Sequence, residues 1–321
     1  MFLSNAVVGH LRDVATWPDL ADGRYTGVRP LGSGGMGRVF AALDEPLGRE
    51  VAIKISHASV LGSDLDARLR QEARVLAQLE HPGIVPVHDL GLLGDGRVFY
   101  VMKLVRGRTL AQSQPPATES AALSVFERVA DAVAFAHARE VIHLDLKPSN
   151  IMVGAFGEVL VMDWGVAKVL SSASSASSAS SPVPHVAGTP GFMAPEQAAG
   201  GAVGPATDVY ALGALLFWLL RGAVPPPDLA AVASILKQPP LRLSRRLRAI
   251  ITRCLATDPA GRYPDASAVV ADLARYRAGD AVQALPETPV DRAVRFAARH
   301  ATIIVLIAAY LLMRTMVVWW R

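Results

Sequence analysis

The chain has 321 residues, of which 51% are hydrophobic, and it carries a formal net charge of +4 at pH 7. An apolar fraction this high excludes a disordered chain, and the small charge, without a basic stripe between aromatic residues, argues against a nucleic-acid partner. The single cysteine, Cys254, excludes an intrachain disulfide and a cysteine metal cluster, and it fits a reducing compartment.

Residues 1–24 form a leader of mixed polarity that we leave unassigned and that lacks the sustained apolar stretch of a secretory signal. Residues 25–105 alternate strand-like apolar patterns with glycines and contain one stretch of helical spacing, 65–79. From about Ser120 onward helical patterns dominate, broken by strand-like pieces near 150–163. The predicted fold class is therefore α+β, with a β-rich lobe, an α-helical lobe and a cleft between them.

A glycine-rich segment at 32–39, GSGGMGRV, is the first chemical motif along the chain. Glycines let backbone N–H groups approach phosphate oxygens, so Gly32, Gly34 and Gly37 are candidate phosphate-binding positions. The same spacing opens dinucleotide-binding folds, but there a helix follows directly, whereas here another strand-like stretch follows. Taken alone, the segment is better explained as an ordinary glycine hairpin.

A lysine, Lys54, ends the apolar stretch VAIK, where it can pair with phosphates inside a cleft. Glu72, on the helix predicted next, can present a carboxylate that orients the Lys54 ammonium. Spacing alone leaves open that Glu72 is instead a surface partner of a nearby arginine such as Arg68.

The segment 143–150, HLDLKPSN, is the most specific in the chain, because it places Asp145, Lys147 and Asn150 in one short loop. These groups are suited to accepting a hydroxyl proton, steadying a transferring phosphoryl group and binding magnesium. Asp163, the first residue of DWG, supplies a second oxygen ligand for a hard cation. A turn residue would explain any one of these polar groups, but not the ordered set.

The order of these motifs, followed by APE at 194–196, resembles that of the protein kinase family over about 250 residues. The phrases EHPGIVPVHD, VMKLVRGRTL, GTPGFMAPEQ, TDVYALG and DPAGRY further resemble bacterial serine/threonine kinases related to eukaryotic ones. The resemblance implies a bilobal protein kinase fold over 25–277, with an N-lobe at 25–105, a C-lobe at 106–277 and an activation segment at 163–196. It also implies transfer of the ATP γ-phosphate to serine or threonine hydroxyls of proteins, the chain itself included, in signalling.

The same resemblance implies roles in catalysis. Asp145 is the catalytic base, and Lys147 neutralises charge on the γ-phosphate during transfer. Asn150 and Asp163 hold Mg²⁺, for which Mn²⁺ is an alternative.

For ATP, the glycines are implied to cover the triphosphate, and Lys54, paired with Glu72, to hold the α- and β-phosphates. Adenine is implied to stack among apolar side chains and to bond the backbone of Lys103 and Val105. The complete set implied to bind ATP is Gly32, Ser33, Gly34, Gly35, Met36, Gly37, Val39, Ala52, Lys54, Glu72, Met102, Lys103, Val105 and Met152.

Structural and substrate-platform roles are also implied. Thr189, together with Lys147, is typical of the serine/threonine branch. Glu196 is implied to be buried against Arg262 as an ion pair, and Asp208 to brace the catalytic loop.

Two departures from the family pattern bear on regulation. Leu144 stands where most regulated members have an arginine that receives an activation-loop phosphate, so we expect activity not to require that phosphorylation. The tract SSASSASSASS at 171–181 predicts a mobile loop. Its many hydroxyls remain candidate sites of phosphorylation even if activity does not require it. Trp164 replaces the usual phenylalanine and is expected to pack with His143 and Leu76.

An apolar stretch at 301–320 follows a linker at 278–300 and is interrupted by Arg314. With that interruption it reaches the ~20 residues that cross a bilayer, and basic residues precede it. We predict a single membrane-spanning helix that keeps the kinase domain on the cytoplasmic side. The alternative is an apolar helix that docks on the kinase domain or forms a homodimer, in a cytoplasmic soluble chain.

An active serine/threonine protein kinase is the leading hypothesis. The rival class is a pseudokinase scaffold that binds nucleotide or partners without transfer, and the intact Lys54, Asp145 and Asp163 argue against it. A kinase of small molecules is disfavoured by GTPGFMAPEQ, which resembles a platform for protein substrates.

Overall fold

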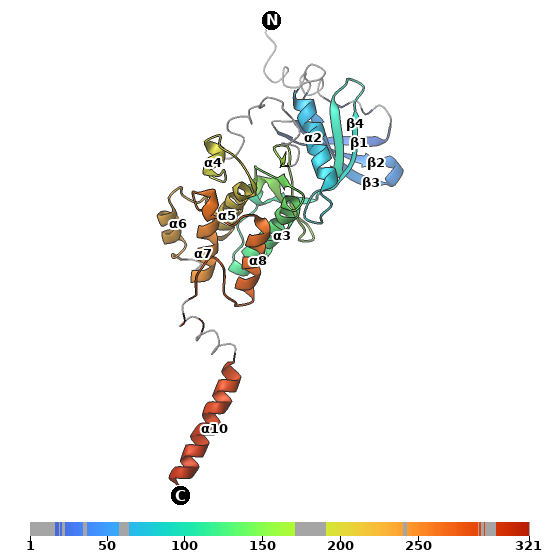
Figure 1. Ribbon diagram of the computed structural model, residues 1–321. Coiled ribbons are helices and arrows are strands. Elements are labelled where there is room, and N and C mark those ends of the chain that lie inside the picture. Colours follow the sequence, from blue (N-terminus) through green and yellow to red (C-terminus); the bar gives the residue numbers. More distant parts are fainter. Residues whose placement is uncertain are drawn as a thin grey trace.

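The computed structural model describes residues 17–320, except 19, 21–22, 35–36, 58–63, 171–190, 240–242, 288, 290–291 and 293–299. A β-rich part and an α-rich part lie next to each other (Figure 1). The predicted α+β arrangement is therefore confirmed for the described residues. Three predictions fall outside them: Gly35 and Met36 in the glycine loop, the serine tract at 171–181, and Thr189.

The β-rich part is one antiparallel sheet of five strands in the order β1-β2-β3-β5-β4. Its strands are β1 (Tyr25–Gly34), β2 (Gly37–Asp44), β3 (Arg49–Ser56), β4 (Val87–Leu92) and β5 (Val98–Lys103). A short 3-10 turn, η1 (Glu45–Leu47), joins β2 to β3. Because side chains alternate along a strand, β2, β3 and β5 each contribute to two apolar layers.

One face of this sheet packs against helix α2 (Asp64–Gln78). Leu69, Ala73 and Leu76 are buried at the spacing of a single helix face, which explains why this stretch folds as an amphipathic helix. The opposite face has its own apolar cluster around Phe40 and Ile53. This layering places α2 beside the strand that carries Lys54.

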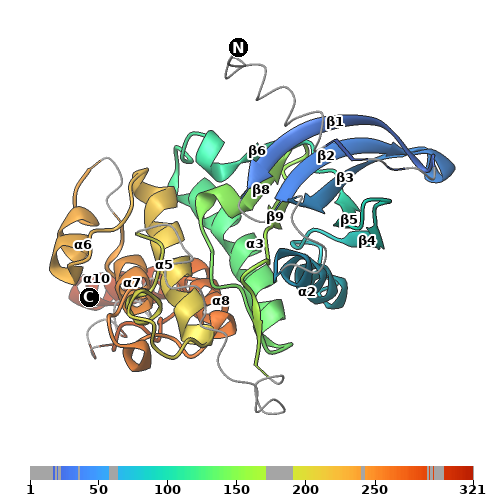
Figure 2. The same ribbon diagram turned by 90° about the horizontal axis from the view of Figure 1, so that it is seen from above.

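The α-rich part is built on long helices that share one apolar core. Its helices are α3 (Glu119–His137), α4 (Pro195–Ala198), α5 (Pro205–Arg221), α6 (Leu229–Ile235), α7 (Arg245–Cys254) and α8 (Ala266–Arg277). Helix α5 is buried along most of its length and ends at Gly222, whose φ of 69° suits a glycine C-cap. Figure 2 shows α5, α7 and α8 gathered beside α3, on the side away from the sheet.

Small strands and 3-10 turns complete the fold. They are β6 (Gly107–Thr109), η2 (Leu110–Gln112), β7 (Val141–Ile142), η3 (Pro148–Asn150), β8 (Ile151–Gly154), β9 (Val159–Val161), β10 (Lys168–Val169) and η5 (Pro259–Gly261). β6, β8 and β9 form one sheet, and β7 pairs with β10. The HLDLKPSN segment therefore runs from β7 into β8, and Asp163 follows β9.

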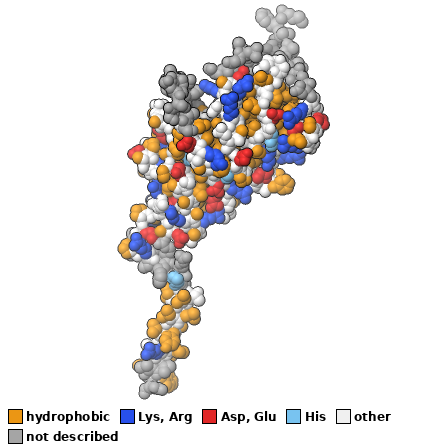
Figure 3. All heavy atoms as spheres, turned by 45° about the vertical axis from the view of Figure 1, so that its right-hand side comes forward, with side chains coloured by type: hydrophobic (Ala, Val, Ile, Leu, Met, Phe, Trp, Pro, Cys, Tyr) orange, Lys and Arg blue, Asp and Glu red, His pale blue; other side chains and the backbone are white. Residues whose placement is uncertain are grey.

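Helix α10 (Ala301–Trp319) forms where the apolar stretch predicts a helix, and it projects away from the rest of the chain (Figures 1 and 3). Its large side chains are exposed, for example Leu306 at 65% and Leu312 at 65%. Among the residues that the structure describes, no helix combines the length and the apolarity needed to cross a membrane. The membrane span predicted for 301–320 is therefore not supported.

Candidate active site

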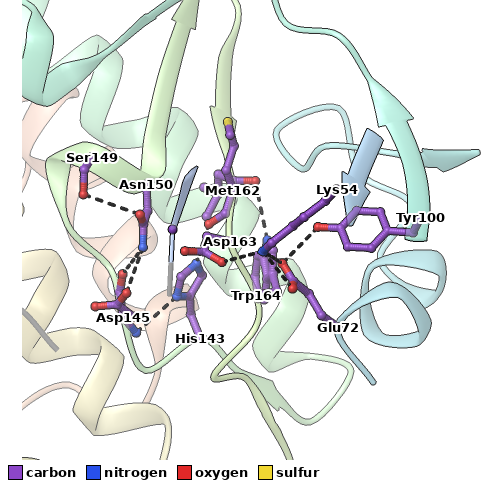
Figure 4. A network of polar contacts seen from close by, with 12 residues as sticks. Lys54, Glu72, Tyr100, His143, Asp145, Ser149, Asn150, Met162, Asp163 and Trp164 are labelled. Carbon is purple, nitrogen blue, oxygen red and sulfur yellow. Dashed lines mark hydrogen bonds and ion pairs between the residues drawn. The ribbon is translucent and has the colours of Figure 1, made fainter. Parts of the chain in front are cut away.

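Lys54 and Glu72 form the centre of a buried polar network between the sheet and the α-rich part (Figure 4). Lys54 Nζ donates to Glu72 Oε1 at 2.8 Å and to Oε2 at 2.9 Å, so the predicted ion pair is present. It also donates to Asp163 Oδ1 at 3.1 Å. Burial alone would lower the pKa of Lys54, but the carboxylates of Glu72 and Asp163 outweigh it and raise this pKa, which keeps the ammonium charged.

Asp163 holds a left-handed backbone conformation, with φ of 59°, directly after β9. Its side chain is 45% exposed, so one carboxylate group reaches both Lys54 and open space. Burial would raise the pKa of Asp163, but the charge of Lys54 and its hydrogen bond lower it below its usual value. Asp163 is therefore ionised at neutral pH and suited to a hard cation.

Asp145 is held by two residues of its own loop. Lys147 Nζ lies 2.8 Å from Asp145 Oδ2. Asn150 Nδ2 donates to the Asp145 carbonyl oxygen at 2.8 Å and to Oδ2 at 3.1 Å. Lys147 and Asn150 thus converge on the Asp145 carboxylate, which is 11% exposed.

Asp208 on helix α5 fixes the loop that carries Asp145. Asp208 accepts hydrogen bonds from the backbone N–H groups of His143 at 2.7 Å and Leu144 at 2.8 Å, which is the bracing that the resemblance implied. Leu144 has a φ of 66°, which a leucine adopts only under tight external restraint. Asp208 supplies that restraint.

Two residues that contact this loop or its brace, His137 and Gln197, were not predicted from the sequence. His137 Nε2 lies 3.0 Å from Asp208 Oδ2, while its Nδ1 accepts from the Ala266 N–H at 3.2 Å, so Nε2 carries the proton. Gln197 Nε2 donates to the Leu144 carbonyl oxygen at 2.7 Å. His137 lies in no motif, and Gln197 ends GTPGFMAPEQ without having been given a role there. No spacing signal links either residue to the loop.

Tyr100 is the third residue that was missed, and its hydroxyl donates to Glu72 Oε1 at 3.0 Å. A signal for it existed. Tyr100 lies two residues before Met102 on β5, and strand alternation places both on one face, which was predicted to meet ATP.

Trp164 is 1% exposed and packs its ring on His143, with 4.5 Å between ring centroids. This contact was predicted, and Leu76 belongs to the same core cluster. The indole Nε1–H points to the Val161 carbonyl oxygen at 3.5 Å. The larger ring is therefore accommodated in the core beside Asp163.

The predicted adenine-binding residues lie around the edge of β3 and β5. Ala52 and Met102 are register partners across these strands, and Val39 packs against the same apolar cluster. Met152 lies on β8, in the small sheet across from them, and is partly exposed. The Lys103 N–H donates to the Pro86 carbonyl oxygen at 3.1 Å, so a ligand would meet the Lys103 carbonyl group instead. Val105 follows β5 and is partly buried.

The described glycines of the loop differ in whether a side chain would fit at their position. At Gly37 an added Cβ would lie 2.1 Å from the Ile55 carbonyl oxygen, so only glycine fits there. At Gly32 and Gly34 an added Cβ would meet nothing within 4 Å, which leaves open space over the strand ends. Ser33 pairs with Arg38 in the β1–β2 hairpin.

Comparison with known proteins agrees with this geometry. Residues 25–272 match the family described as protein kinase domain. The chain belongs to this family. The crystal structure of the Mycobacterium tuberculosis PknI kinase domain resembles it with a TM-score of 0.57 and 28% identity, covering 78% of this chain and 94% of that one.

Curated relatives of this kinase domain are named serine/threonine-protein kinases. PrkC of Bacillus subtilis is 36% identical over 266 residues, which cover 78% of this chain and 40% of PrkC. PknA of Mycobacterium tuberculosis is 36% identical over 283 residues, which cover 83% of this chain and 64% of PknA. The chain thus spans less than two thirds of the length of either relative.

Proposed function

We propose that this chain is an ATP-dependent protein kinase that phosphorylates serine and threonine residues of proteins. One observation carries the proposal: Lys54 lies between Glu72 and Asp163, while Asp145, Lys147 and Asn150 converge a short way along the same network. A site without transfer activity needs no such convergence of a phosphate ligand, a base and cation ligands. The names of the relatives support the serine/threonine class.

Asp145 would accept the proton of the substrate hydroxyl. Its carboxylate is held by Lys147 and Asn150, which supports a fixed aim toward an incoming oxygen. Lys147 lies close enough to meet the negative charge that develops on the transferred phosphoryl group. The transfer would be in line, through a loose transition state, as in the family that the chain resembles.

Lys54 would bind the ATP phosphates, and Glu72 would orient it. Gly32, Gly34 and Gly37 would cover the triphosphate, since the open space at the first two admits a close ligand. Adenine would lie between Ala52 on β3 and Met152 on β8. Its edge would meet the backbone at Lys103 and Val105.

Asn150 and Asp163 would hold Mg²⁺, and both residues fit the ion. Asn150 directs its amide nitrogen to Asp145, so its Oδ1 is the atom suited to a cation. Asp163 is ionised and partly exposed. A bound magnesium ion would neutralise phosphate charge, and Mn²⁺ has the same preference for oxygen ligands.

The boundaries of the kinase domain and of its parts are also part of this proposal. The kinase domain would run from 25 to 277, because α8, which ends at Arg277, completes the helical core. Its N-lobe would cover 25–105, and the activation segment 163–196. Homodimerisation through α10 stays a prediction.

The test is transfer of labelled γ-phosphate from ATP and Mg²⁺ to the chain and to a generic protein substrate, followed by acid hydrolysis. Label recovered as phosphoserine and phosphothreonine supports the proposal. A folded chain that binds ATP and transfers no label would contradict it and favour the pseudokinase scaffold.

A further inference from the structure

Tyr100 has no role in any kinase motif of this chain, yet it contacts the central ion pair of the site. Its hydroxyl donates to Glu72 Oε1 at 3.0 Å. Tyr100 is 2% exposed and Glu72 is 1% exposed, so water does not compete for this bond. Figure 4 shows the Tyr100 ring beside the Lys54 side chain, with its hydroxyl directed to the Glu72 carboxylate. A hydrogen bond to a carboxylate in such surroundings is stronger than one in water.

The sheet register explains why Tyr100 reaches Glu72. Lys54 and Tyr100 are Cα partners across the antiparallel pair β3–β5. Directly opposed residues send their side chains to the same face of a sheet, here the face covered by α2. Lys54 Nζ lies 6.0 Å from the centroid of the Tyr100 ring, which adds a weak cation–π contact. Glu72 therefore receives donors from two neighbouring strands.

The two donors differ in what else they do. Lys54 is shared, because it also contacts Asp163 at 3.1 Å and would turn toward phosphates when ATP binds. The Tyr100 hydroxyl ends a ring with two rotatable bonds that is packed in the core, so it stays where the sheet puts it. Glu72 is thus held by one donor that moves with the nucleotide and one that does not.

We propose that Tyr100 is a positioning residue for ATP binding, whose hydroxyl keeps Glu72, and with it helix α2, in the place from which Glu72 orients Lys54. This inference rests on the proposed kinase function. It gives β5, the strand that leads to the adenine-binding backbone, a direct link to α2.

The inference has a kinetic signature. Without the hydroxyl, Glu72 spends part of its time away from Lys54. The apparent affinity for ATP then falls in proportion to the fraction of molecules in which Glu72 still orients Lys54. Saturating ATP draws the molecules back to the competent state. The KM for ATP therefore rises while kcat is retained. A folding defect would instead lower kcat in proportion to the enzyme lost and leave this KM unchanged.

The variant Tyr100→Phe removes only the hydroxyl and keeps the ring and its packing. Tyr263→Phe is the matched control: Tyr263 is 0% exposed and donates to a buried carboxylate, Asp272 Oδ2, at 2.6 Å, but it lies in the α-rich part. We expect the KM for ATP to rise about tenfold in Tyr100→Phe, with kcat within about twofold. Tyr263→Phe should leave the KM for ATP unchanged.

An unchanged KM for ATP in Tyr100→Phe, or the same rise in both variants, overturns the inference. Calorimetric titration of the full chain with ATP and Mg²⁺ separates this failure from failure of the proposed function. If the wild type transfers no phosphate, the kinase proposal fails, and the role of Tyr100 is then decided by the Kd for ATP. A Kd about tenfold weaker in Tyr100→Phe alone supports it, and equal values reject it.

Discussion

Arg262 and Glu196 form a bidentate ion pair, with Nη1 donating to Oε1 and Nη2 to Oε2, both at 2.8 Å. The Arg262 side chain is 0% exposed and that of Glu196 is 12% exposed. The family resemblance implied this pair. It joins the short helix α4 to the segment before α8, and Thr207 on α5 completes it by donating to Glu196 Oε1 at 2.9 Å.

Arg262→Ala should lower the free energy of unfolding by about 3–5 kcal/mol, because it leaves the Glu196 carboxylate buried without its partner. The change also removes hydrogen bonds to the carbonyl oxygens of Ala206, Ala256 and Thr257. Urea denaturation measures the effect. Arg68→Ala, on the exposed side of α2, is the control and should change stability by less than about 0.5 kcal/mol. Equal effects of the two variants would contradict this account of the pair.

The stability that Glu196 contributes should disappear in acid. Burial would raise the pKa of Glu196, but hydrogen bonds from Arg262 and Thr207 lower it below the ordinary value of 4.5. A lowered folded-state pKa gives stability that is present above pH 4.5 and is lost as the pH falls through that pKa. The difference in unfolding free energy between wild type and Glu196→Gln should therefore shrink below this pH. A difference that stays constant down to pH 3 would refute the assignment.

Activity should not depend on phosphorylation of the serine tract at 171–181. Leu144 is 6% exposed and offers no cation to receive a phosphate, and its loop is already braced by Asp208 and Gln197. Replacement of all serines in the tract by alanine should leave turnover nearly unchanged. A loss of about a hundredfold, or ~3 kcal/mol of transition-state stabilisation, would reject the idea.

The polar site was largely predictable from the sequence, because each motif carries its own local geometry. HLDLKPSN is short enough that Asp145, Lys147 and Asn150 have to lie close together, and the order of motifs indicated which lobes meet. The Lys54–Glu72 pair needed the structure, since the sequence left a surface partner open for Glu72. Its alternative, an exposed carboxylate beside Arg68, is wrong because Glu72 is 1% exposed.

The residues that were missed act through register and packing between elements distant in sequence. Tyr100 meets Glu72 only because β3 and β5 align Lys54 with Tyr100. His137 meets Asp208 because α3 packs against α5. At the C-terminal stretch, by contrast, the sequence led to a prediction that went too far. Its apolarity predicted helix α10, but the membrane span also predicted there is not supported, because no helix among the described residues has the length and apolarity that crossing a membrane requires.

The most direct test of the central claim is phosphoryl transfer by Asp145→Asn. Asp131→Asn makes the same chemical change on the exposed face of α3 and is the matched control. If Asp145 is the base of a serine/threonine kinase, wild type and Asp131→Asn transfer label from γ-labelled ATP to serine and threonine. Asp145→Asn should lose this activity by at least about a hundredfold while it still binds ATP. Transfer by Asp145→Asn at the wild-type rate would contradict the account.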